Sequence, residues 1–188
     1  MAIKTFNSGE VLTASDTNTY LANAGLVFVK QVSLSTGTSD ITSCFSATYA
    51  AYRIVLNALV PSTTDIQLRG QMLSGSTPLT TNTYEAQRLY VQGATVGGGG
   101  TAGTAIGYGY IGYITTAAAG GGAGGVIDII NPFTANYTSW FASTSYQYAY
   151  HETNTAVVKN TTSYDGFRIT CSTGTCTGTA TVYGYRLG

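Results

Sequence analysis

Charge is what this sequence has least of. Of its 188 residues, eight are Lys or Arg and eight are Asp or Glu, so charged side chains make up 9% and the formal net charge is zero. A nucleic-acid-binding surface needs clustered Lys and Arg to neutralise phosphates, whereas the basic residues here are scattered. We therefore expect no nucleic-acid partner. So few charges give only weak repulsion between copies of the protein. We therefore expect much of the surface to be covered by further copies or by a larger assembly.

Long apolar runs are also absent. No stretch of 18 apolar residues occurs, so we expect no membrane insertion. Met1-Ala-Ile-Lys4 leads into polar residues and not into the apolar segment of a secretory signal, which predicts synthesis in a cytoplasm.

Recognisable catalytic motifs are missing. His151 is the only histidine and lies beside Glu152, but no serine has a Gly-x-Ser-x-Gly setting, and the glycine runs lack the Gly-Lys-Ser/Thr of a phosphate loop. The acidic residues are dispersed, so nothing supports a glycosidase pair. We expect no enzyme, no cofactor and no metal site.

Cysteine is scarce and odd in number, with three residues. Cys44 is expected in the core. Cys171 and Cys176 would face each other across a turn centred on Thr173-Gly174, where a disulfide is possible. A reducing cytoplasm favours the alternative, two small apolar residues with free thiols.

What the chain does contain is typical of β structure. Thr, Ser, Gly, Ala and Tyr dominate, 44% of residues are hydrophobic and 15 are Tyr. Residues 52–59 alternate, with Tyr52, Ile54, Leu56 and Ala58 predicted on one face. Residues 65–72 alternate in the same way, and residues 26–34 and 126–130 read as further strands. Residues 137–150 read as one long aromatic strand.

The closing segment, residues 165–188, has two extended runs around Ser172-Thr-Gly-Thr175. Gly174 can supply the positive φ of a tight turn, so a hairpin is predicted, with the last strand central in a sheet. About ten strands with almost no helix between them predict an all-β protein, an antiparallel jelly-roll-like β-sandwich spanning residues 26–188.

Residues 1–25 differ from this body. Thr13-Ala-Ser-Asp16 resembles a capping box and predicts a helix of about ten residues. Such a helix is too short to be stable alone, so this N-terminal helical arm is expected to dock on another chain or to fold back on its own body. Both alternatives remain open.

Aromatic residues and hydroxyl groups together are suited to stacking on sugars. The candidates for a glycan-binding or interface surface are Tyr108, Tyr110, Tyr113, Trp140, Tyr146, Tyr148 and Tyr150. The simpler interpretation, which we favour, is that they fill a core or a subunit interface.

Four stretches carry a resemblance to bacteriophage structural proteins. Phe6-Asn-Ser-Gly-Glu-Val-Leu-Thr-Ala-Ser-Asp-Thr-Asn-Thr-Tyr-Leu21 resembles the opening of many phage tail and fibre proteins. Phe45-Ser-Ala-Thr-Tyr-Ala-Ala-Tyr-Arg-Ile-Val55, Ile129-Ile-Asn-Pro-Phe133 and Gly178-Thr-Ala-Thr-Val-Tyr-Gly-Tyr-Arg-Leu-Gly188 are similar to a family of small phage structural proteins. Cys171 and Cys176 depart from the Pro and aliphatic residue expected at those positions.

The resemblance implies a virion protein with a β-rich, homotrimeric body and offers no catalytic residues. The first hypothesis is a fibre or spike subunit that attaches to tail, baseplate or capsid proteins through its arm and contacts a host surface glycan through its body. Candidate attachment residues are Phe6, Val11, Leu12, Tyr20 and Leu21. The alternative is a capsid decoration (cement) protein, and a depolymerase is the weakest hypothesis.

Overall fold

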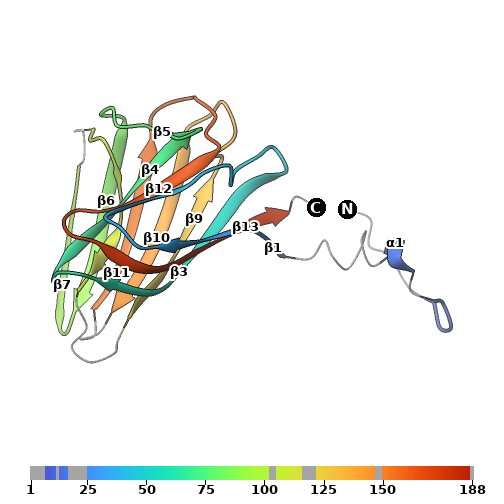
Figure 1. Cartoon of the computed structure of the whole chain (residues 1–188), viewed down its shortest axis with the longest axis horizontal. Helices are drawn as coiled ribbons and strands as arrows, with labels where there is room; N and C mark the ends of the chain where they lie inside the picture. Colours follow the sequence, from blue (N-terminus) through green and yellow to red (C-terminus); the bar gives the residue numbers. More distant parts are fainter. Residues whose placement is uncertain are drawn as a thin grey trace.

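The chain is nearly all β, with two antiparallel sheets packed face to face (Figure 1). The computed structural model describes residues 7–11, 13–16, 25–101, 105–115, 122–146 and 150–186, which contain thirteen strands. Sheet A has the order β1 (Leu26–Leu34), β13 (Cys176–Arg186), β3 (Tyr49–Pro61), β9 (Ala123–Ile130), β10 (Thr138–Tyr146), β11 (Tyr150–Val158), β6 (Tyr84–Gln92), β7 (Thr95–Gly100). Sheet B has the order β2 (Thr38–Ile41), β12 (Gly166–Cys171), β4 (Ile66–Ser74), β5 (Thr77–Pro78), with β8 (Gly109–Ile114) also paired to β4.

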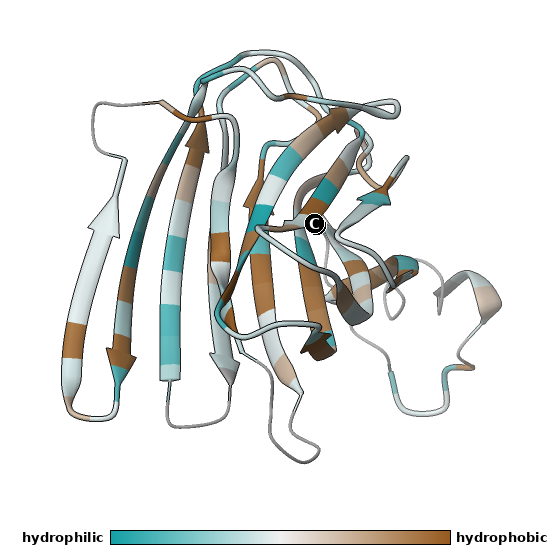
Figure 2. Ribbon diagram, turned by 60° about the vertical axis from the view of Figure 1, so that its left-hand side comes forward, coloured by the Kyte–Doolittle hydropathy of each residue, from teal (hydrophilic) through white to brown (hydrophobic). Residues whose placement is uncertain are grey.

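The core lies between the sheets because alternate residues of each strand point inward. Apolar and polar bands accordingly alternate along many of the strands (Figure 2). Trp140 is the largest fully buried side chain, and its ring meets Tyr84 and Phe167 edge-on at centroid distances of 5.9 and 5.4 Å. Residues from both sheets therefore share one aromatic centre.

The alternation predicted for residues 52–59 is correct up to Leu56 and then fails. Tyr52, Ile54 and Leu56 are buried, but Ala58 is exposed with a φ of 51°. The pairing of β3 with β9 shifts between Leu56 and Leu59, so an irregularity turns Leu59 into the core in place of Ala58.

The prediction that the two strands around Gly174 pair with each other as a hairpin is wrong. The turn is present, and Gly174 has a φ of 63°. However, β12 pairs with β2 and β4 in sheet B, whereas β13 pairs with β1 and β3 in sheet A. The chain therefore crosses from one sheet to the other at this turn, and its last strand does lie between two partners.

Cys171 and Cys176 form a disulfide at this crossing, which corrects the expectation of free thiols. The bond joins the end of sheet B to the start of β13 in sheet A. Cys44 is a free, buried cysteine, and burial raises the pKa of its thiol to about 12.

The long strand predicted over residues 137–150 is two strands. β10 ends at Tyr146, and β11 starts at Tyr150 and runs back along it, from Tyr146 opposite Tyr150 to Thr138 opposite Val158. The strand predicted over residues 126–130 starts earlier, because β9 begins at Ala123.

Little of the predicted arm is described. One helical turn, α1 (Ala14–Asp16), follows a turn at Asn7–Glu10, and Val11 between them is 78% exposed. The other candidate attachment residues, Phe6, Leu12, Tyr20 and Leu21, lie outside the described residues. Within the described part of the chain, no helix has the length and apolar character needed to cross a membrane.

Candidate functional site: a tyrosine-lined hollow

A hollow of about 280 Å³ opens where sheet A extends past the edge of sheet B. Its lining residues, which define the tyrosine hollow, are Asp65, Arg88, Tyr90, Gln92, Tyr113 and Tyr150. Along β6 the inward-facing residues become steadily less buried, from Tyr84 through Arg88 to Gln92. The reason is that β8 forms the edge of sheet B here, so the last inward positions of β6 remain uncovered.

The wall that β8 contributes is fixed by side chains from sheet A. Trp140 Nε1 donates to the Tyr110 carbonyl at 2.9 Å, and Asn154 Nδ2 donates to the Ile111 carbonyl at 3.0 Å. The backbone N–H of Tyr113 donates to Glu152 Oε2 at 3.1 Å. Buried backbone groups need hydrogen-bond partners, so these three bonds satisfy the free edge of β8 and set its height above sheet A.

Glycines in β8 allow this close approach to sheet A. A Cβ on Gly109 would lie 2.2 Å from the Trp140 ring, and one on Gly112 would lie 2.0 Å from Thr144 Oγ1. Larger residues at either position would push β8 away from sheet A.

Two tyrosines form the floor of the hollow. The rings of Tyr90 and Tyr150 stack with centroids 5.7 Å apart and an interplanar angle of 10°. Tyr90 also lies over Gly97 of β7, where a Cβ would come within 2.4 Å of the phenol ring. The hydroxyl of Tyr150 donates to Glu152 Oε2 at 3.0 Å. The buried Glu152 thus orients both the Tyr150 ring and the backbone of Tyr113.

The positively charged Arg88 side chain lies between the floor and the β8 wall. The Arg88 guanidinium carbon is 5.2 Å from the Tyr90 ring centroid and 4.9 Å from that of Tyr113. Guanidinium groups stack favourably on aromatic faces, so the two rings hold Arg88 in place. Asp65 also lines the hollow and has a φ of 57° in the loop before β4.

The predicted aromatic residues divide into three groups. Tyr113 and Tyr150 line the hollow. Tyr108 and Tyr110 form a separate pair on β8 and the turn before it, with ring centroids 6.2 Å apart and Arg69 4.1 Å from the Tyr108 ring. Burial, with the nearby Tyr108 phenol second, raises the pKa of Tyr110.

The remaining candidates do not belong to this surface. Trp140 is fully buried, so the idea that it lies on an exposed sugar-binding face is wrong, and its role is in the core. Tyr148 and the side chain of Tyr146 lie outside the described residues. His151 and Glu152 point to opposite faces of β11, with His151 exposed, so they do not face each other as a catalytic pair would.

Four of the six lining residues were not singled out from the sequence: Asp65, Arg88, Tyr90 and Gln92. The signal was available, because the period of two that starts at the buried Tyr84 places Arg88, Tyr90 and Gln92 on the inward face. Polar residues at inward positions are a sign of an uncovered or functional surface. In the described residues, no group of three or more His, Cys, Asp or Glu side chains could hold a metal ion.

Comparison with known proteins gives no family assignment. No protein-family model, no curated protein and no solved structure matches this chain.

Proposed function

We propose that this protein is a phage virion structural protein, a fibre or spike subunit whose β body binds a saccharide of the host surface in the tyrosine hollow. The observation that carries the proposal is the stacked Tyr90–Tyr150 pair, with Arg88 and Gln92 beside it and Asp65 on the rim. Aromatic floors pack against the apolar face of a sugar ring, and the polar groups around them bind its hydroxyls. A small, open hollow of this kind is suited to one sugar residue of a longer glycan.

The place in a virion rests on the opening and closing sequence motifs. We propose that residues 1–25 form the helical arm that attaches the subunit to other virion proteins and that the body faces outward. The hollow supports a fibre or spike over a cement protein, because a purely structural decoration needs no sugar site.

We also propose that the body is a jelly roll with two insertions. Without β5–β7 and β10–β11, eight strands remain, in two four-stranded sheets with the orders β1-β13-β3-β9 and β2-β12-β4-β8. Eight strands in two sheets, with the chain crossing repeatedly between them, is the jelly-roll arrangement. The insertions β6, β7, β10 and β11 widen sheet A on one side, and it is this extension that carries most of the hollow.

A homotrimer is proposed on the outer face of sheet A. One row of paired residues crosses this face from Phe28 through Tyr183, Arg53 and Asp128 to Phe141. Phe28 is 60% and Phe141 53% exposed. Arg53 and Asp128 neutralise each other within the row at 2.6 Å. Such a surface, apolar and free of net charge, is suited to contact with a second copy of itself.

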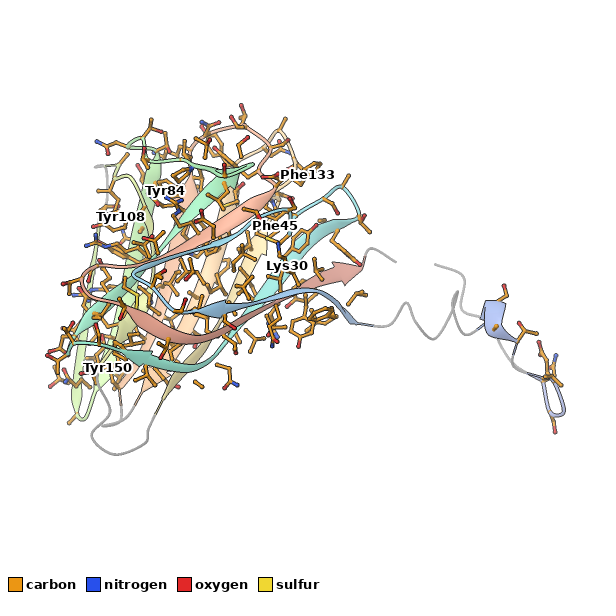
Figure 3. The ribbon with its side chains drawn as sticks, viewed as in Figure 1. Lys30, Phe45, Tyr84, Tyr108, Phe133 and Tyr150 are labelled. Carbon is orange, nitrogen blue, oxygen red and sulfur yellow. A yellow bond between two sulfur atoms is a disulfide. The ribbon has the colours of Figure 1, made fainter. Side chains whose placement is uncertain are left out.

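Sugar binding is tested by saturation-transfer NMR, using a mixture of methyl glycosides that includes neutral and acidic sugars. We expect binding by the native chain and a loss of at least tenfold in affinity for Tyr90→Ala, because the stacking floor is removed. Tyr137→Ala is the matched control, since Tyr137 is exposed and precedes β10 at the end of the sandwich away from Tyr150. Figure 3 shows this separation through Phe133, near Tyr137 in sequence, and Tyr150. Equal binding by both variants would refute the sugar site.

The location is tested by immunogold labelling of virions with antibodies against the body. Label on the tail or baseplate is expected. Label spread over the head shell would reject the fibre assignment in favour of the decoration protein.

A further inference from the structure

Among the residues that the structure describes, no acidic group forms an ion pair with the Arg88 side chain. The ion pairs among the described residues join Arg53 with Asp128, Lys159 with Glu85, and Arg168 with Asp40. Arg88 belongs to none of them, and its contacts within the described residues are with the rings of Tyr90 and Tyr113. An Arg side chain in a partly buried hollow ordinarily has an anionic partner.

We infer that the sugar bound in the tyrosine hollow is an acidic one and that the Arg88 guanidinium binds its carboxylate. This inference rests on the proposed function, since it specifies which class of sugar the same hollow accepts. The guanidinium is planar and carries its N–H donors along its edge, while its face stacks on aromatic rings. With Arg88 held by two rings, that edge remains available for the paired hydrogen bonds that a carboxylate accepts.

Arg69 of β4 is a second arginine that stacks on a tyrosine, and it has a hydrogen-bond partner. Its guanidinium lies 4.1 Å from the Tyr108 ring centroid, and its Nε donates to Gln67 Oε1 at 2.9 Å. Arg69 does not line the hollow. Arg88 also lies over tyrosine rings, has no side-chain hydrogen bond to the part of the chain that the structure describes, and is the arginine that lines the hollow.

The other polar groups of the hollow determine how the bound sugar is oriented. Asp65, from the loop before β4, is the carboxylate of the lining, so it repels an acidic group and accepts hydrogen bonds from hydroxyls. Gln92 offers an amide that can donate and accept. A sugar with its carboxylate toward Arg88 and its hydroxyls toward Asp65 satisfies both ends, whereas a neutral sugar leaves the cation without a partner.

The test compares two matched pairs of probes by NMR titration with the full-length chain. Methyl β-D-glucuronide is paired with methyl β-D-glucoside, and methyl α-D-galacturonide with methyl α-D-galactoside. Within at least one pair we expect the acidic sugar to bind about tenfold more tightly, the gain typical of a hydrogen bond to a charged group. Raising the salt concentration to about 0.5 M should weaken the binding of the acidic sugar and leave the binding of the neutral sugar unchanged.

Arg88→Gln should remove this preference, so that the acidic and the neutral sugar of each pair bind the variant with equal affinity. Arg88→Lys should retain part of it, because a lysine keeps the charge but not the planar pair of donors. Arg69→Gln is the control and should keep the full preference. Thermal denaturation of each variant shows whether it remains folded; if Arg88→Gln is unfolded, Arg88→Lys and the salt dependence decide.

Three results would overturn the inference. Equal binding of the acidic and neutral sugars in both pairs leaves the sugar site intact and rejects the carboxylate. Sodium acetate alone binding as tightly as the acidic sugar means a general anion site. Absence of binding by all four sugars rejects the proposed function, and the inference with it.

Discussion

At the scale of single residues, Gly109 gives the sharpest test of how β8 is seated. An added Cβ would lie 2.2 Å from Trp140 Cζ2 and 2.6 Å from the Cβ of Ala156, both in the packed interior. Gly109→Ala must therefore displace the indole or lift β8, and overpacking of this kind costs about 1–3 kcal/mol. We expect that loss in the free energy of unfolding measured with urea.

The matched control for this substitution is Gly124→Ala in β9, where the nearest atom to a new Cβ is the Leu56 carbonyl oxygen at 3.4 Å. It should change stability much less than Gly109→Ala. Two variants of equal stability would mean that β8 does not rest on Trp140.

The same scale explains which site residues could be predicted. Tyr113 and Tyr150 stand out in the sequence because they belong to conspicuous aromatic stretches. Arg88 and Gln92 do not, since an arginine or glutamine in a strand is normally read as facing solvent. Their inward direction follows from alternation, but their exposure follows from where sheet B ends, and that depends on pairing between distant residues.

At the scale of the elements, the disulfide between β12 and β13 contributes a measurable part of the free energy of unfolding. Cys171 and Cys176 are five residues apart, and closing so short a loop in the unfolded chain contributes about 2 kcal/mol in the chain-entropy model. Replacing both residues with Ser should lower the free energy of unfolding by about that amount. Dithiothreitol should produce a similar loss in the native chain and none in the double variant.

An unchanged denaturation midpoint in the double variant would contradict a covalent link between the sheets. The effect should also reach the hollow, because the crossing holds the loop that bears Asp65. Ser62 N donates to the Thr175 carbonyl and Gln67 N donates to Ser172 Oγ, at 2.9 and 3.0 Å. A weaker affinity for sugars in the double variant is the expected companion result.

Most individual strands were predictable, whereas their assembly was not. Alternation identified β1 over Leu26–Leu34 and the apolar part of β9, because one-sided burial leaves a period of two in the sequence. The same pattern could not show that β12 and β13 belong to different sheets, since a tight turn and a crossing between sheets use similar residues. It also could not separate β10 from β11, because the residues that join them are themselves strand formers such as Tyr and no Gly or Pro lies between the two strands.

At the scale of the whole molecule, electrostatics contributes through a few pairs rather than through net charge. The sixteen formally charged side chains sum to zero at pH 7, so repulsion among like charges is weak near that pH. Arg53 and Asp128 join β3 to β9 through two hydrogen bonds of 2.7 and 2.6 Å, and Tyr185 of β13 donates to Asp128 at 2.8 Å. One carboxylate therefore connects three neighbouring strands on the outer face of sheet A.

This arrangement predicts how stability responds to acid. The hydrogen bonds from Arg53, which outweigh partial burial, lower the pKa of Asp128 below its ordinary value of 3.8. A carboxyl group whose pKa is lower in the folded state stabilises the fold above the unfolded-state pKa, and this contribution disappears as the pH falls through the folded-state value. We expect the free energy of unfolding to drop as the pH is lowered from about 4, by up to about 1 kcal/mol from this partly exposed group.

Asp128→Asn should be less stable than the native chain at pH 7, because Arg53 loses its partner, and should show a smaller loss between pH 4 and pH 2. Glu85→Gln is the control, since Glu85 pairs with Lys159 near the start of β6 and does not connect three strands. Urea denaturation at both pH values measures each difference. If the native chain and Asp128→Asn lost stability in parallel on acidification, the link between β3, β9 and β13 would not depend on the ionised carboxylate. In a trimer formed through this face, the same substitution should also weaken association, which sedimentation at pH 7 would detect as a lower average mass.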